Sequence, residues 1–137
     1  MKRILVTGAC GSIGSALVKK LIKEKHTVCA FDNSEDGLFH LKNEYKEKET
    51  SSKLKIFIGD IRDQERLVQA MEKVDMVFHC AALKHVELSE YNPFEALQTN
   101  VNGTNNVVNA AIKCGVEKVL VTSSDKAVNP SSMMGAT

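Results

Sequence analysis

Five short runs of apolar and β-branched residues recur along the 137-residue chain, and segments with a helical spacing of apolar residues separate them. Almost every position within a run is apolar, which is typical of strands buried on both faces of a parallel sheet. The runs span residues 3–7, 27–31, 55–59, 76–80 and 118–122. The pattern therefore predicts five parallel strands.

The segments between the runs show the three- and four-residue spacing of amphipathic helices. The positions that define it are Ile13, Ala16, Leu17 and Leu21, then Leu67, Ala70 and Met71, and then Val107, Val108 and Ala111. This alternation predicts an α/β fold, a Rossmann-type doubly wound parallel sheet of order 3-2-1-4-5. The polar stretch 42–53 is predicted to be a solvated helix end and loop.

Residues 1–137 are predicted to form one domain. The full two-halved version of this fold continues to a sixth strand, whereas only residues 123–137 follow the fifth run. We therefore expect the domain to be incomplete at its C-terminus.

Composition narrows the class of partner. The chain has 18 Lys and Arg against 17 Asp and Glu, so no net field favours nucleic acid or an anionic membrane surface, and a small-molecule partner is expected. No apolar run is long enough for a membrane helix, and the first residues are too short for a signal peptide, so we expect a cytoplasmic protein. The four cysteines form no C-x-x-C pair and are expected to be reduced, with no metal site.

A glycine loop follows the first strand. Gly8, Gly11 and Gly14 stand between that strand and the first helix, with Ser12 and Ile13 among them. Backbone amides and a helix N-terminus converge there, which suits the pyrophosphate of a dinucleotide. A plain strand-to-helix turn is the alternative, but the position of the loop in the chain favours dinucleotide binding.

Asp32 ends the second strand, where a carboxylate binds an adenosine ribose. It would repel a 2′-phosphate, so NAD is favoured over NADP. Asn33, Ser34 and Lys42 remain as alternative partners for such a phosphate.

After the third strand, "GDIRD" places Asp60 and Ile61 where an adenine edge would lie. The alternative reading of this motif is a helix cap by Asp60 or Asp63.

The spacing Gly8-x-x-Gly11-x-x-Gly14 resembles the short-chain dehydrogenase/reductase superfamily in its extended, nucleotide-sugar branch. The stretches "GDIRD", "FHCAALKHVELSEYNPFEALQTNVNGTNNV" and "SSDKAVNPSSMMGAT" resemble, more narrowly, the bacterial and archaeal UDP-N-acetylglucosamine 4,6-dehydratases, the CapD-like polysaccharide biosynthesis proteins. The resemblance covers the whole chain.

The resemblance implies roles for the residues after the fourth strand. Ala81 and Ala82 would line the cofactor, Lys84 and His85 would lie toward the UDP-sugar, and Asn100 would brace the site. From the residues alone, Lys84 and His85 read equally as solvated loop residues and Asn100 as a helix asparagine. On the same grounds, His79 reads as a core histidine.

The resemblance also gives a role to "SSDK" after the fifth strand. The implied chemistry is oxidation at sugar carbon 4, loss of water across carbons 5 and 6, and return of the hydride to carbon 6. Ser124, Asp125 and Lys126 would supply the acid and the base, and the Asp-Lys pair indicates inversion at carbon 5. A turn with two exposed charges is the alternative.

Two departures from the superfamily pattern matter. Met134 stands at the position of the usual tyrosine and cannot take a proton, so Ser124 or Asp125 is expected to relay the proton of the carbon-4 hydroxyl. Thr137 is one residue short of the usual lysine. The chain is therefore expected to be the cofactor-binding half of an enzyme and to be inactive alone. The enzyme is expected to be a homo-oligomer. An epimerase or ketoreductase of the same superfamily, and a non-catalytic nucleotide-binding module, are the alternatives.

Overall fold

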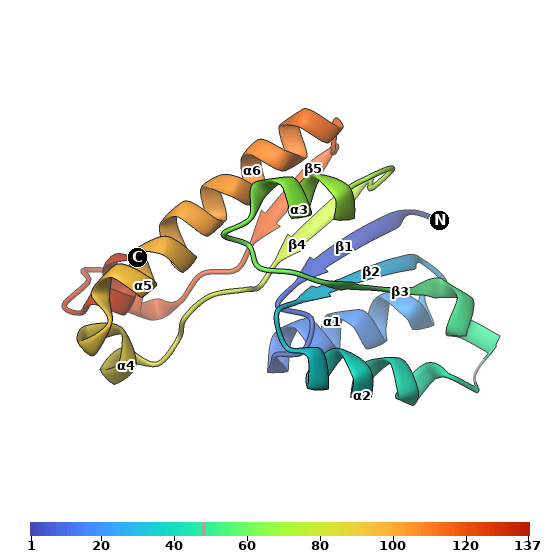
Figure 1. The fold of residues 1–137 in the computed structure, drawn as a ribbon, viewed down its shortest axis with the longest axis horizontal. Helices are drawn as coiled ribbons and strands as arrows, with labels where there is room; N and C mark the ends of the chain where they lie inside the picture. Colours follow the sequence, from blue (N-terminus) through green and yellow to red (C-terminus); the bar gives the residue numbers. More distant parts are fainter. Residues whose placement is uncertain (48) are drawn as a thin grey trace.

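The computed structural model describes residues 1–47 and 49–137, and of Asp125 the backbone only. A five-stranded, all-parallel sheet in the order β3-β2-β1-β4-β5 forms its centre, which confirms the predicted fold class and strand order (Figure 1). The strands are β1 (Arg3–Thr7), β2 (Thr27–Asp32), β3 (Leu54–Ile58), β4 (Met76–His79) and β5 (Lys118–Val121).

Two helices cover each face of the sheet and give a three-layer α/β/α domain. On one face, α1 (Ser12–Lys23) and α2 (Glu35–Tyr45) pack on the side chains of β1 and β2. On the other face lie α3 (Gln64–Ala70) and α6 (Gly103–Cys114). Alternate residues of β1 point to the two cores, so that Ile4 and Val6 enter the first and Leu5 the second.

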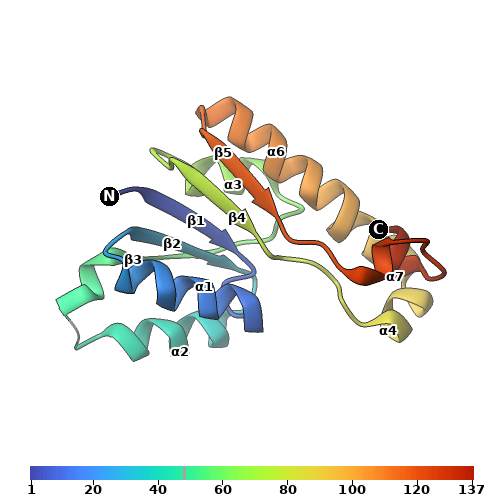
Figure 2. The same ribbon diagram turned by 180° about the vertical axis from the view of Figure 1, so that it is seen from behind.

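The remaining elements are short. A 3-10 turn (η1, Glu49–Lys53) precedes β3, within the stretch that was predicted to be a helix end and loop; Lys48 lies outside the described residues. Figures 1 and 2 both show the others gathered beyond the carboxyl edge of the sheet. These are α4 (Val86–Tyr91), α5 (Pro93–Ala96), the π-helix η2 (Leu97–Asn102), the 3-10 turn η3 (Asp125–Ala127) and α7 (Met133–Ala136).

Some predicted burial is wrong. The edge strands β3 and β5 are only partly covered, and Leu120 and Val121 are each nearly half exposed, because an edge strand has a neighbour on one side only. Ile13, predicted on the buried face of the first helix, is also half exposed. Val18 and Ile22 fill that core instead.

Within the described residues, the four cysteines are free thiols and no cluster of three or more His, Cys, Asp or Glu side chains could hold a metal ion. In the same residues, no helix has the length and apolarity required to cross a membrane.

His79, at the end of β4, is a buried histidine, as the plainer reading of its sequence predicted. Its Nδ1 lies 2.6 Å from Thr7 Oγ1 and its Nε2 lies 3.1 Å from Thr104 Oγ1. Thr104 donates its one hydroxyl proton to Asn100 O at 2.6 Å, so it accepts from the ring, and Nε2 therefore holds the proton. Thr7 then donates to Nδ1. The imidazole is thus a neutral link between β1 and the start of α6.

Burial lowers the pKa of His79 from 6.5 to about 4. The unfolded histidine binds a proton below about pH 6.5, and the folded one does so only near pH 4, so stability falls as the pH is lowered through this window. Between about pH 7 and pH 4.5, this group should lower the free energy of unfolding by about 2 kcal/mol. His79→Gln should lose that part of the pH dependence in urea unfolding curves, and His40→Gln, which changes an exposed histidine, is the control. Equal slopes for parent and His79→Gln would contradict the assignment.

Candidate functional site

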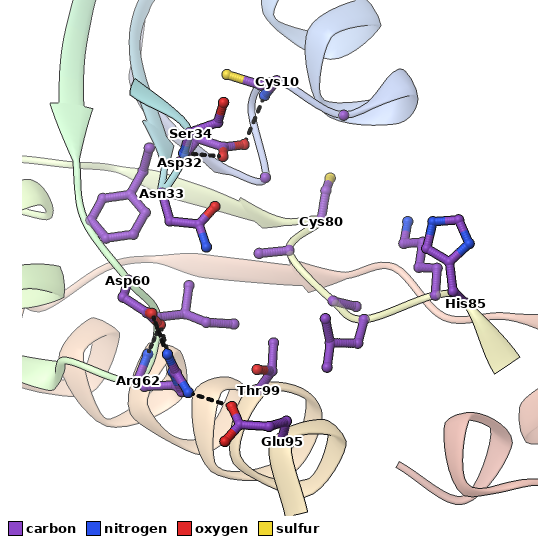
Figure 3. A pocket seen from close by; sticks show the side chains of 18 of the residues that line it. Cys10, Asp32, Asn33, Ser34, Asp60, Arg62, Cys80, His85, Glu95 and Thr99 are labelled. Atoms are coloured by element: carbon purple, nitrogen blue, oxygen red, sulfur yellow. Dashed lines mark hydrogen bonds and ion pairs between the residues drawn. The ribbon is translucent and has the colours of Figure 1, made fainter. Parts of the chain in front are cut away.

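A cleft of about 970 Å³ opens at the carboxyl edge of the sheet, where β1, β2, β3 and β4 end (Figure 3). Open parallel sheets bind ligands at this edge, where the strand order reverses. The cleft is lined by most of the residues that were predicted to bind cofactor or substrate. These are Gly8, Gly11, Ser12, Ile13, Asp32, Asp60, Ile61, Ala81, Ala82, Lys84 and His85.

The three glycines of the loop are needed for different reasons. Gly8 has φ +66°, and a Cβ there would lie 2.7 Å from Ala81 N, so it permits β1 and β4 to end side by side. A Cβ on Gly14 would lie 2.0 Å from Gly8 O, so Gly14 lets α1 pack on the loop. A Cβ on Gly11 would meet nothing closer than Gly8 O at 3.4 Å, an ordinary contact. Gly11 is therefore free of the internal clash that fixes the others, and its missing side chain leaves room in the cleft.

Asp32 is fixed at the end of β2 by two backbone amides. Its Oδ2 accepts from Cys10 N and its Oδ1 from Ser34 N, both at 2.9 Å. The carboxylate is thus bound directly to the glycine loop and lies beside it in the lining of the cleft (Figure 3). Asn33 and Ser34 line the cleft as well, whereas Lys42, in the last turn of α2, is not among the lining residues.

Cys10 is a lining residue that the sequence did not single out. Burial, with a smaller contribution from the adjacent Asp32 carboxylate, raises the pKa of its thiol to about 11. The thiol therefore stays protonated and unreactive at neutral pH.

In the loop after β3, the two aspartates of "GDIRD" have different roles. Asp63 is the N-cap of α3 and accepts from Arg66 N at 3.1 Å, so the helix cap is Asp63. Asp60 lines the cleft and accepts from both the backbone and the side chain of Arg62. The side chain of Ile61 is 5% exposed and belongs to the core under α6, so little of it is left to meet a ligand.

Asn100 does not line the cleft but supports its wall. Its Oδ1 accepts from Leu83 N at 2.8 Å and its Nδ2 donates to Leu83 O at 3.2 Å, so the amide holds the backbone that follows Ala81 and Ala82. Nδ2 also lies 2.8 Å from Thr137 Oγ1. The π-helix places Asn100 toward the domain and Thr99 in the lining of the cleft.

The predicted acid–base segment lies beside the cleft and not in its lining. Ser124 Oγ accepts from Lys126 N at 3.2 Å, and Lys126 is exposed. The side chain of Asp125 lies outside the described part of the structure. A Cβ on Gly135 would lie 2.3 Å from Lys126 O, so α7, which contains Met134, packs directly on this turn.

Further lining residues were missed. All of them except Arg62 lie in the segment 88–99, whose placement against the loop after β3 is a matter of tertiary packing. Arg62 could have been predicted, since it lies inside "GDIRD", but only Asp60 and Ile61 of that motif were considered as site residues. The missed residues are Arg62, Leu88, Asn92, Glu95 and Thr99.

A family profile described as polysaccharide biosynthesis protein matches residues 4–137. The chain is 53% identical, over 99% of its length, to a Methanocaldococcus jannaschii protein named an uncharacterized membrane protein. It is 41% identical, over 99% of its length, to an inverting UDP-N-acetylglucosamine 4,6-dehydratase of Campylobacter jejuni, and 42% identical, over 98%, to a UDP-glucose 4-epimerase of Rickettsia prowazekii. The chain spans about 40% of the length of each relative.

Solved structures with the same fold include Pen from Bacillus thuringiensis, with a TM-score of 0.94 and 44% identity over 98% of this chain and 42% of that one. A dTDP-glucose 4,6-dehydratase double mutant from Streptomyces venezuelae, solved with NAD bound, has a TM-score of 0.86 and 27% identity over 98% of this chain and 47% of that one.

Gly11 and Gly14 allow a matched test of the cleft. Gly14→Ala should lower the free energy of unfolding by about 1–3 kcal/mol, because its methyl group meets Gly8 O. Gly11→Ala should unfold close to the parent temperature but bind NAD about tenfold more weakly or worse, because the methyl group takes up the space for a phosphate. Thermal unfolding and calorimetric titration separate the two effects. Unchanged NAD affinity in a folded Gly11→Ala protein would argue against phosphate binding at this loop.

Proposed function

The chain belongs to the polysaccharide biosynthesis protein family, among the nucleotide-sugar short-chain dehydrogenase/reductases, and we propose that it is the dinucleotide-binding part of a UDP-N-acetylglucosamine 4,6-dehydratase. The main support is the cleft, which is lined by the glycine loop and Asp32 together, with Ala81 and Ala82 beside them. The similarity to the Campylobacter jejuni dehydratase supports the reaction and the sugar.

NAD fits this cleft by two features of the chain. Gly11 has no side chain although the protein has room for one there, so a space is left in the cleft next to the N-terminus of α1. Backbone amides would bind a pyrophosphate in this space. Asp32 has both oxygens oriented by amides, which suits two ribose hydroxyls and disfavours a 2′-phosphate. When bound, the nicotinamide would accept a hydride from the sugar and return it.

The chain's own contribution to the chemistry is proposed to be acid–base. Ser124, Asp125 and Lys126 follow β5 directly, and β5 ends beside β4, so the turn lies next to the wall formed by Ala81 and Ala82. Lys126 is proposed to remove the carbon-5 proton and Asp125 to protonate the departing hydroxyl. Because Lys126 is exposed, it is proposed to act as a base only when the bound sugar nucleotide excludes water from it.

Met134 is proposed to have no proton role, since a thioether cannot donate or accept a proton in this chemistry. Ser124 or Asp125 would then relay the proton of the carbon-4 hydroxyl. Lys84 and His85 both line the cleft. His85 lies on the far side of Cys80 from Asp32 (Figure 3), and both residues are proposed to contact the sugar nucleotide.

A UDP-glucose 4-epimerase is the second candidate, because the Rickettsia prowazekii epimerase is as similar to this chain as the dehydratase is. The two differ in the product. An epimerase returns the hydride to carbon 4 and releases no water, whereas a dehydratase yields a 4-keto-6-deoxy sugar.

Asp32→Ala should lower the ratio of NAD to NADP affinity about tenfold, because the variant no longer repels the 2′-phosphate. The matched control is Asp36→Ala, which removes an equal charge from the first turn of α2, outside the cleft lining. Calorimetric titration with both dinucleotides measures the ratio. The ribose assignment is wrong if the ratio is the same in Asp32→Ala and the parent.

The reaction is tested with residues 1–137 joined to the part of the Campylobacter jejuni dehydratase that follows the matched region. With UDP-N-acetylglucosamine in deuterium oxide, mass spectrometry should show a 4-keto-6-deoxy product with deuterium at carbon 5. Lys126→Ala should lower deuterium incorporation at carbon 5 by about 10²-fold or more, the size of a general-base effect, and Asp125→Asn should chiefly block loss of the hydroxyl.

Lys113→Ala changes an exposed lysine on α6 and is the control. Deuterium incorporation at the parent rate in Lys126→Ala would place the base elsewhere, and a 4-epimer as the product would favour the epimerase.

A further inference from the structure

Glu90 joins two segments of the chain that are 43 positions apart in the sequence. It lies on α4, and its Oε1 accepts a hydrogen bond from the backbone N–H of Met133, the first residue of α7. The two short helices pack against each other beyond the carboxyl edge of the sheet (Figure 2). The bond therefore ties the segment that follows β4 to the segment that follows β5.

The helix α7 depends on partners outside it. It has four residues, and a helix this short is not stable in water by itself. Its first backbone N–H groups have no acceptor within the helix. Ser132 Oγ accepts from one of them at 3.1 Å, and Glu90 is the acceptor for Met133 N. The other end is held by Thr137 Oγ1, which lies 2.8 Å from Asn100 Nδ2. Glu90 therefore holds the N-terminal end of α7 from another part of the fold.

The position of α7 determines the position of the turn η3. A Cβ on Gly135 would lie 2.3 Å from Lys126 O, so the backbone of α7 lies directly on the backbone of the turn. Because a glycine meets a carbonyl oxygen at this contact, no flexible side chain of α7 can absorb a shift there. A displacement of α7 is therefore passed on to the turn, and with it to Lys126.

The other partner, α4, borders the cleft. It begins at Val86, directly after Lys84 and His85, and His85 is its N-cap residue. Lys84 and His85 line the cleft, as does Leu88 in the middle of the helix. Glu90 thus connects a helix beside the proposed sugar-nucleotide end of the cleft to the helix that packs on the proposed acid–base turn.

We propose that Glu90 is a positioning residue for the acid–base turn, and that it acts through its hydrogen bond to Met133 N. The bond keeps α7 packed on η3 and so holds Lys126 at the distance from the bound sugar nucleotide that proton transfer requires. This inference rests on the proposed function, since it needs Lys126 to be the base. The bond needs an acceptor oxygen and not a charge. Glu90→Gln should therefore keep the role, whereas Glu90→Ala should lose it.

Backbone hydrogen exchange in residues 1–137 tests the contact without any substrate. Glu90→Ala should speed exchange of the Met133 amide about tenfold, the factor expected for one lost hydrogen bond. Exchange of the Lys126 and Ala127 amides, whose hydrogen bonds close η3, should rise about threefold or more, because the turn loses part of its support. Glu90→Gln should keep the parent rates. The control, Glu87→Ala, removes an equal charge from an exposed position on the same helix and should also keep them.

The joined protein described above measures the effect on the reaction, with UDP-N-acetylglucosamine in deuterium oxide. At saturating substrate, Glu90→Ala should lower deuterium incorporation at carbon 5 about tenfold and leave KM within about twofold of the parent, because a misplaced base affects the transition state and not substrate binding. Glu90→Gln should keep at least about half of the parent rate, and Glu87→Ala should match the parent. Thermal unfolding of each variant should stay close to that of the parent, since Glu90 is exposed.

Two groups of results separate this inference from the proposed function. Unchanged exchange at Lys126 in Glu90→Ala, a parent rate of deuterium incorporation in that variant, or an equal loss of rate in Glu90→Gln overturns the positioning role and leaves the proposed dehydratase standing. Absence of deuterium at carbon 5 in the product of the parent joined protein overturns the proposed role of Lys126 and the positioning role with it.

Discussion

The close approach of Gly8 to the backbone at Cys80 and Ala81 is the constraint on which the cleft depends. Two parallel strands end side by side there, with no side chain between them, and a Cβ would lie 2.7 Å from Ala81 N. Because Gly14 packs as closely on Gly8 O, the first helix, the glycine turn and the end of β4 form one tightly packed unit. The walls of the cleft are therefore set by backbone packing before any ligand is bound.

Buried polar groups fix the wall of the cleft that is formed by the loop after β4. Thr7 Oγ1 accepts from the amides of Cys80 and Ala81, at 3.1 and 3.3 Å, while it donates to His79. Through Thr104 the same chain of hydrogen bonds reaches Asn100, whose side chain holds Leu83. The loop after β4 is thus fixed from both ends by partners that must all keep one orientation. An unpaired member of such a buried chain would cost more than the bond it loses, which favours a single conformation.

The sequence predicted the sheet order, the glycine loop and the position of Asp32, because these depend on local patterns: apolar runs, glycine spacing and a carboxylate at a strand end. Two kinds of feature could not be predicted from the sequence. The exposure of β3 and β5 depends on which strands are edges. The hydrogen bond from Arg62 Nη1 to Glu95 Oε2 joins two residues that are 33 positions apart in the sequence. The functional reading of Asp125 and Lys126 came from a resemblance, and their turn lies beside the cleft and not among its lining residues.

The π-helix η2 has a geometric consequence for the whole helical segment. Gly103 N donates to Gln98 O, five residues back, so this stretch contains one residue more than an α-helix of the same hydrogen-bonded span. Removal of one residue would restore α-helical bonding and turn everything before it by about 100° relative to α6. Such a turn would swing Glu95 and Thr99 off the cleft and Asn100 off Leu83 together. The one extra residue therefore sets the angle between two faces of the helical segment, so that Glu95 and Thr99 line the cleft while Asn100 supports its wall.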